Sequence, residues 1–139
     1  MNQTQPLGNQ APKEEAQFPI VKVFLGGDKS NDWRLEFISM LQIGYFNPIN
    51  KSLIEIKQEK KKCDYHLYVI NSLTDCLSIA EAVDSSNKEP NKTLICVPKA
   101  YIRKSSDFAE IEKIITNNGS KCFTTLTETA KFLNHGRKR

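Results

Sequence analysis

Two carboxylates, Asp75 and Glu81, stand six residues apart where an apolar segment meets a polar turn and a helical pattern begins. In an α/β protein, ligands bind at the carboxyl ends of strands, because the loops there and the N-terminus of the next helix face an open crevice. If Asp75 caps that helix, Glu81 lies on the following turns, within reach of the crevice. At about 100° per residue, this glutamate borders an apolar arc formed by Cys76, Ala80 and Val83.

A carboxylate partly shielded by apolar groups can act as a nucleophile toward an electron-poor sugar carbon. Glu81 is therefore the candidate nucleophile, and Asp75 is the candidate supporting group. The alternative is an ordinary pair, in which Asp75 only caps the helix and Glu81 is a surface glutamate.

The elements that must position these residues follow from hydrophobic periodicity. The expected strands are 20–25, 45–46, 64–70, 93–97 and 121–124, and the expected helices are 33–41, 51–62, 75–87, 105–118 and 127–134. Each crossover is about one helix long, which predicts a parallel sheet with helices on both faces. The expected fold class is α/β, a flavodoxin-like three-layer sandwich with a five-stranded, mostly parallel sheet.

This topology gathers the residues that follow strand ends along one edge of the sheet. The candidate binding residues there are Gly26, Gly27, Asp28, Asn47 and Asn71. Trp33 has the spacing of a core residue, with base stacking as its alternative role. Arg34 and Lys29 are expected to be solvated, with contact to a phosphate as the alternative. In the segment 51–62, three apolar residues are expected to face inward: Leu53, Ile54 and Ile56.

Several common occupants of this fold are excluded by motif. The first strand is not followed by G-x-G-x-x-G, and no G-x-x-x-x-G-K-[ST] occurs, which excludes dinucleotide and P-loop sites. A phosphate-accepting receiver domain needs an aspartate at the end of the third strand, where this chain has Asn71. Ser-His-Asp catalysis is disfavoured because His66 lies within a strand, His135 is near the C-terminus and no G-x-S-x-G elbow presents a serine.

Composition limits the class of protein. With 139 residues, 39% of them hydrophobic and 26% charged, the chain fits one globular domain, expected at 18–135. Residues 1–17 are expected to be a disordered tail and residues 136–139 a basic tail. The net charge of +4 comes from segments with little aromatic interleaving, which disfavours polymeric nucleic acid as a partner. No apolar run reaches the roughly 20 residues of a membrane span, and no secretory signal is recognisable, so a cytoplasmic location is expected.

The four cysteines contain no C-x-x-C pair and lie in or beside apolar runs. They are expected to be buried and reduced rather than to form disulfides or a metal site. They are Cys63, Cys76, Cys96 and Cys122.

The chain resembles the nucleoside 2-deoxyribosyltransferase-like family from residue 21 to about residue 97. The similar segments are VFLGG at 23–27, DWR at 32–34, YFNP at 45–48, CD at 63–64 with the strand that follows, and SIAEAVD at 78–84. Their order and spacing carry the resemblance, and the fold of the family is the flavodoxin-like sheet expected above.

The resemblance implies that Glu81 attacks the anomeric carbon of a 2-deoxyribosyl group, forming a covalent sugar–enzyme ester as the base leaves. A second base or water then releases the sugar with retained configuration, as in retaining glycosidases. Asp75 matches an aspartate that orients the sugar or assists the base. The implied substrate is a small-molecule nucleoside or nucleotide, no metal or other cofactor is needed, and family members commonly form homo-oligomers. The substrate-binding candidates are Phe24, Gly26, Gly27, Asp28, Trp33, Asn47, Asn71 and Ser78.

Two hypotheses follow. The first is an enzyme that cleaves or exchanges the N-glycosidic bond of a 2-deoxynucleoside or deoxynucleotide. The second is an inactive protein that binds a nucleoside or nucleotide derivative in the same pocket. Departures from the pattern of active family members favour the second: glycines are absent around Glu81, where the chain has Ser78 and Ala82, and Phe24 stands where many have tyrosine. Ile56 also stands where active members have an acidic residue.

Overall fold

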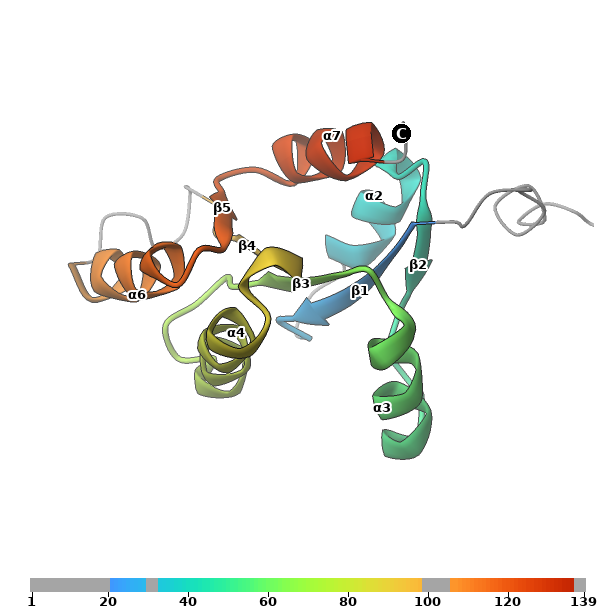
Figure 1. Ribbon diagram of the computed structural model, residues 1–139, viewed down its shortest axis with the longest axis horizontal. Helices are drawn as coiled ribbons and strands as arrows, with labels where there is room; N and C mark the ends of the chain where they lie inside the picture. The colour runs from blue at the N-terminus through green and yellow to red at the C-terminus, as the bar shows by residue number, and fades with distance from the viewer. Residues whose placement is uncertain (1–20, 30–32, 99–105, 137–139) are drawn as a thin grey trace, which may run out of the picture.

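Five parallel strands form a single sheet, as predicted (Figure 1). The computed structural model describes residues 21–29, 33–98 and 106–136; the two expected tails lie outside these ranges, except for Gly136. The strands are β1 (Lys22–Gly27), β2 (Gly44–Phe46), β3 (Tyr65–Val69), β4 (Thr93–Cys96) and β5 (Lys121–Phe123), in the order β2-β1-β3-β4-β5. Because every pair is parallel, all carboxyl ends lie at one edge. The flavodoxin-like α/β prediction is confirmed.

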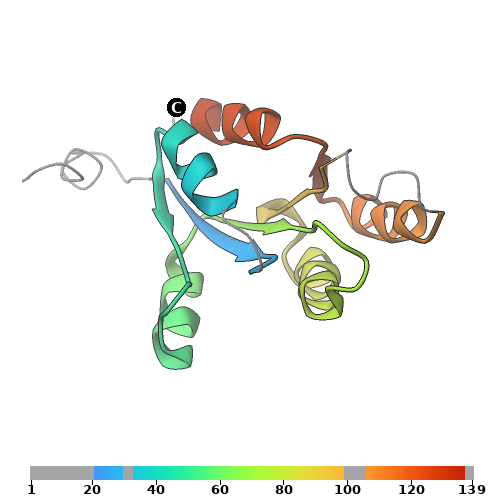
Figure 2. The same ribbon diagram turned by 180° about the vertical axis from the view of Figure 1, so that it is seen from behind.

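Helices cover both faces of the sheet and make it the middle of three layers (Figures 1 and 2). They are α2 (Trp33–Met40), α3 (Leu53–Lys62), α4 (Cys76–Lys88), α6 (Ser106–Asn117) and α7 (Leu126–Gly136), with a 3₁₀ turn, η2 (Pro90–Lys92), before β4. α2 and α7 lie on one face, and α3, α4 and α6 lie on the other. Within the described ranges, every helix is too short or too polar to cross a bilayer.

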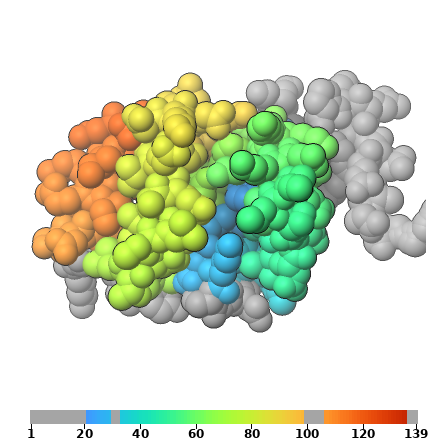
Figure 3. All heavy atoms as spheres, turned by 90° about the horizontal axis from the view of Figure 1, so that it is seen from below, coloured from blue at the N-terminus to red at the C-terminus, as the bar shows by residue number. Residues whose placement is uncertain are grey.

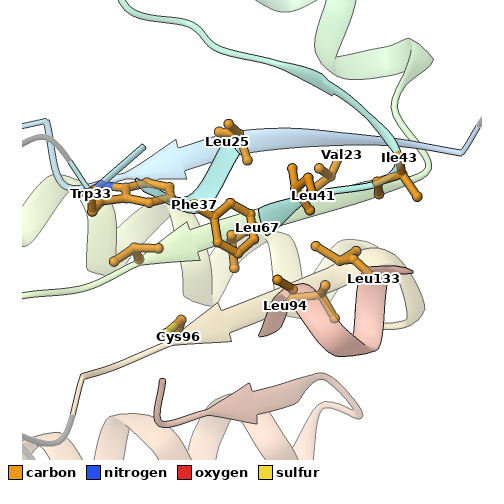
Figure 4. Packing of buried hydrophobic residues seen from close by; sticks show 12 residues of the cluster. Val23, Leu25, Trp33, Phe37, Leu41, Ile43, Leu67, Leu94, Cys96 and Leu133 are labelled. Carbon is orange, nitrogen blue, oxygen red and sulfur yellow. The ribbon is translucent and has the colours of Figure 1, made fainter. Parts of the chain in front are cut away.

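Strand alternation divides the core into two sides. Val23 and Leu25 of β1 point toward α2 and α7, where they pack with Phe37 and Leu133 (Figure 4). Phe24, between them in the sequence, points to the opposite face and packs with Phe46 and Cys63. Burying each large apolar side chain stabilises the fold by about 1.5–3 kcal/mol. The alternation therefore fixes which face of β1 lies under α3 and α4.

Helix α3 departs from the prediction. Leu53 and Ile54 are 80% and 70% exposed, and only Ile56 of the three expected inward residues is half-buried, against the Phe24 cluster. The reason is that α3 lies over the β2 edge of the sheet and extends away from it, so no neighbouring element covers its first turn (Figures 1 and 2).

The cysteine prediction is confirmed in part. All four are thiols; Cys63 and Cys96 are buried and Cys122 is half-buried, but Cys76 is exposed. Cys76 is the first residue of α4, and the helix turns its side chain away from the sheet.

Candidate functional site

A cavity of about 330 Å³, here called the edge pocket, lies between the loop after β1 and the first turns of α4. It sits at the carboxyl ends of β1 and β3, where the topology predicts a ligand site. Nine residues line it: Gly27, Asp28, Lys29, Ser72, Thr74, Asp75, Leu77, Ser78 and Glu81. The two candidate catalytic carboxylates, Asp75 and Glu81, therefore share one cavity with a third acidic residue, Asp28.

Asp75 caps α4 through only one of its two carboxylate oxygens. Its Oδ1 accepts a hydrogen bond from the backbone N–H of Ser78 at 3.2 Å, which satisfies one of the unpaired donors of the first turn. Its Oδ2 is buried and has no hydrogen-bond partner among the described residues. A buried carboxylate oxygen without a donor is costly, so this atom is suited to accept a hydrogen bond from a ligand hydroxyl.

Small side chains bring α4 close to the sheet and place Glu81 at the pocket. The buried stripe of the helix is Ser78, Ala82 and Ser86, spaced four residues apart. The predicted apolar arc is therefore wrong in two of its members, because Cys76 and Ala80 are exposed. Glu81 lies on the flank of the small stripe. Its side chain is exposed and makes no hydrogen bond or ion pair with any other residue in the described ranges.

The opposite wall of the pocket is held in place by Arg34. Its guanidinium is buried and donates to the carbonyls of Leu25 at 3.0 Å, Asp28 at 2.8 Å and Gly27 at 3.4 Å. The expectation of a solvated Arg34 is therefore wrong, because the N–H groups of its guanidinium donate to backbone carbonyls at the end of β1 and in the loop that follows. Burial lowers the pKa of Arg34 to about 10, while Asp28 opposes that shift, so the side chain stays charged at neutral pH.

Replacing Arg34 by Met is expected to lower the free energy of unfolding by about 2–3 kcal/mol, because carbonyls of the loop lose their donors. Urea denaturation measures this loss. The exposed neighbour Leu35, replaced by Ala, serves as the control and should change stability by less than about 0.5 kcal/mol. Equal midpoints for the Arg34 variant and the unaltered protein would contradict the assigned role.

Trp33 is a core residue rather than part of the pocket lining. It is 7% exposed, packs against Phe37 with ring centroids 5.9 Å apart, and its Nε1 donates to the Asp28 carbonyl at 2.8 Å. It therefore supports the pocket wall from the other side of the sheet. The expectation that Trp33 is a core residue is confirmed.

The structure brings together half of the candidate site residues. Gly27, Asp28, Asp75, Ser78 and Glu81 line the edge pocket, whereas Phe24, Gly26, Trp33, Asn47 and Asn71 do not. Phe24 points under α3, stacked on Phe46 with centroids 6.0 Å apart. The Asn47 carboxamide is used locally, since its Oδ1 accepts from the N–H of Ile49 at 3.1 Å.

Four further lining residues are not among the candidate site residues: Lys29, Ser72, Thr74 and Leu77. Ser72 and Thr74 belong to the polar turn after β3, where their hydroxyls lie 2.7 Å apart. The position of this turn, directly after a strand, is the sequence feature that indicates a place at the pocket. Leu77 lies four residues before Glu81, on the same face of α4. Its 64% exposure in an otherwise polar rim has no counterpart in the sequence pattern.

A second, larger hollow adjoins the first. This cavity of about 720 Å³, here called the lysine groove, lies between α3 and α4, and Figure 3 shows it as a depression between the two helices with β1 at its floor. Its lining is Lys57, Lys60, Lys61, His66, Glu81, Asp84, Ser85, Lys88, Glu89 and Lys92. Glu81 lines both hollows and thus stands at their junction.

His66 lies at the bottom of the lysine groove and is neutral at physiological pH. Its side chain is 4% exposed, and its Nε2 donates to the Lys60 carbonyl at 2.9 Å. Burial is the main cause that lowers the pKa of His66 below 6.5; Glu89, whose Oε1 lies 3.6 Å from Nδ1, acts in the opposite direction.

This shift predicts a pH dependence of stability. Because the folded state binds a proton less readily than the unfolded chain, the contribution of His66 is complete above about pH 6.5 and is lost as pH falls through the lowered pKa. Urea denaturation at pH 7.5, 6 and 5 should show a steeper decline for the unaltered protein than for His66→Gln. Parallel declines in the stability of the two proteins would contradict the predicted contribution of His66.

Within the described ranges, no group of three or more His, Cys, Asp or Glu residues is arranged to hold a metal ion. Comparisons of the chain with family models, with curated proteins and with solved structures find no match.

Proposed function

We propose that the protein cleaves or exchanges the N-glycosidic bond of a 2-deoxynucleoside or deoxynucleotide, with Glu81 as the nucleophile. The observation that carries the proposal is the shared cavity of Glu81 and Asp75, in which Asp75 Oδ2 is buried without a partner among the described residues. The resemblance to the nucleoside 2-deoxyribosyltransferase-like family supports the same two residues.

In the proposed first step, the Glu81 carboxylate attacks C1′ of the sugar. The bond between C1′ and the base nitrogen breaks, its electron pair leaves with the base, and the base takes up a proton from solvent. An ester then joins C1′ to Glu81. In the second step, water or another base attacks C1′ and gives up a proton to solvent, the ester bond breaks, and Glu81 is released as a carboxylate with the configuration at C1′ retained.

Asp75 serves as the positioning group in this mechanism. Its Oδ1 is engaged by the first turn of α4, so Oδ2 is the oxygen left to accept a hydrogen bond from the sugar. A hydroxyl held there fixes the sugar relative to Glu81, and such fixed geometry accounts for a large part of many enzymatic rates. The exposed Glu81 side chain is the group that approaches the sugar.

The direct test is product analysis. The protein is incubated with the natural deoxynucleosides and their 5′-monophosphates, with and without an acceptor base, and the mixtures are separated by chromatography. The proposal expects free base in the absence of an acceptor, or an exchanged nucleoside in its presence. Intact substrate in every mixture would overturn the proposal.

A second candidate function is binding without turnover. Phe24 brings no hydroxyl to the pocket, and Glu81 has no partner in the described ranges that would orient it. A protein that retains a deoxynucleoside or its monophosphate in equilibrium dialysis but never changes it would fit this alternative. Because proteins of the family that the chain resembles commonly form homo-oligomers, we further propose that this protein forms a homo-oligomer. We also propose that it acts in the cytoplasm.

A further inference from the structure

We propose that the lysine groove binds a phosphate group, so that the substrate is a deoxynucleotide rather than a deoxynucleoside. The assignment of that phosphate to the substrate rests on the function proposed above, whereas phosphate binding in the groove stands on its own observations. The groove lies between α3 and α4. It is separate from Lys29 and Arg34, for which the sequence offered contact with a phosphate as an alternative role.

The groove carries an excess of positive charge. Five lysines and three carboxylates line it, which leaves two positive charges uncompensated. Two of the lysines are paired locally, Lys88 with Asp84 at 3.2 Å and Lys92 with Glu89 at 4.0 Å. A phosphate monoester carries about −1.5 to −2 charges at neutral pH, which matches the excess.

The uncompensated charge is concentrated on α3. Lys57, Lys60 and Lys61 form no ion pair with any residue in the described ranges. The nearby carboxylate of Glu59 is engaged by other lysines, Lys22 at 2.9 Å and Lys62 at 3.5 Å. Lysines three and four residues apart on a helix repel one another, so this cluster costs stability unless an anion joins it.

Lys60 is half-buried, whereas Lys57 and Lys61 are exposed. The Nζ of Lys60 lies 5.3 Å from the ring centroids of both Phe24 and Tyr68, which hold the ammonium by cation–π attraction. The backbone carbonyl of Lys60 is fixed by His66 at 2.9 Å. A half-buried ammonium held from two sides loses little freedom when it meets an anion, so the groove is preorganised for one.

The proposed nucleophile, Glu81, also lines the lysine groove. It lines both the edge pocket and the lysine groove, so a sugar whose C1′ lies at Glu81 stands at the junction of the two. In a 5′-nucleotide the base is attached at C1′ and the phosphate is carried through C5′ on C4′, so the two groups leave the sugar from different carbons on either side of the ring oxygen. The base can therefore occupy the acidic edge pocket while the phosphate reaches the lysines.

The experiment measures binding in the Glu81→Gln protein, so that no turnover interferes. Calorimetry compares each natural deoxynucleoside, its 5′-monophosphate and inorganic pyrophosphate. The test variant is Lys57→Ala with Lys61→Ala, both exposed and so replaceable without loss of packing. The matched control removes two exposed lysines outside both hollows, by Lys113→Ala with Lys131→Ala.

We expect a monophosphate to bind at least about tenfold more tightly than its nucleoside, and the test variant, but not the control, to remove most of that preference. Equal affinity of nucleoside and monophosphate, or a preference that survives the test variant, would overturn the inference while leaving glycosidic cleavage intact. Lysine-dependent binding of pyrophosphate without any binding of nucleotides would support the phosphate site and overturn the proposed function instead.

Discussion

The Glu81→Gln variant is expected to lose turnover of the deoxynucleoside or deoxynucleotide substrate by more than about 10⁴-fold. The amide keeps the size and hydrogen-bonding reach of the side chain but cannot form the ester with C1′, and removal of an enzymatic nucleophile typically has an effect of at least this size. Initial rates of base release, measured by chromatography, check the loss. Substrate affinity should change by only a few fold, because the pocket lining is otherwise unchanged.

Glu110→Gln provides the matched control for this variant. Glu110 lies on α6, lines neither the edge pocket nor the lysine groove, and is paired with Lys113 at 3.7 Å. The same acid-to-amide change there should leave the rate of base release within about threefold, since exposed ion pairs contribute little. A Glu81→Gln protein that turns over within tenfold of the unaltered protein would remove Glu81 from the mechanism.

The Gly27→Ala variant is expected to lose about 4 kcal/mol of its free energy of unfolding. Gly27 ends β1 with φ of +100°, a conformation that costs a residue with a side chain about 1–2 kcal/mol. A Cβ there would also clash with the backbone nitrogen and the carbonyl oxygen of Val69. Backbone atoms cannot move aside as a flexible side chain can, so β1 and β3 must separate at the pocket.

Gly119→Ala separates the two causes. Gly119 follows α6 with a similar φ of +107°, but a Cβ there would meet only Pro90 Cβ at 3.4 Å, an ordinary contact. Its expected loss is therefore the conformational part alone, about 1–2 kcal/mol. Urea denaturation of both variants measures the difference, and equal losses would show that the close approach to Val69 carries no cost.

Periodicity and strand order made the fold predictable. Helical and strand patterns alternate from residue 20 to residue 134. Because the connections between parallel strands are right-handed, few arrangements of such a pattern are possible. The placement of Asp75 and Glu81 followed from the same reasoning. A cap residue after β3 and a residue six positions later must lie at the carboxyl edge of the sheet.

Features that depend on neighbouring elements were not predictable from one segment at a time. Leu53 and Ile54 have an inward spacing, yet the short edge strand β2 leaves nothing to cover them. The inward face of α4 follows Ser78, Ala82 and Ser86 rather than Cys76 and Ala80, although both stripes consist of small residues. Periodicity alone does not report such a preference.

The surroundings of the charged side chains were the hardest feature to predict. Arg34 looks like a surface residue in sequence, because the carbonyls that bind it come from a different element, the end of β1. The lysines of α3 line a groove that requires α4 as its second wall, so the sequence of α3 alone does not predict it. Such sites emerge only when two helices are placed against the same sheet.

The central claim, that Glu81 forms a covalent bond to the sugar, is tested most directly by mass spectrometry. The protein is mixed with a deoxynucleoside or its 5′-monophosphate in the absence of an acceptor base, quenched in acid and digested. The predicted result is a deoxyribosyl or deoxyribosyl-phosphate adduct on the peptide that contains Glu81, absent from the Glu81→Gln protein. An adduct on another residue, or base release at an undiminished rate by Glu81→Gln, would contradict the claim.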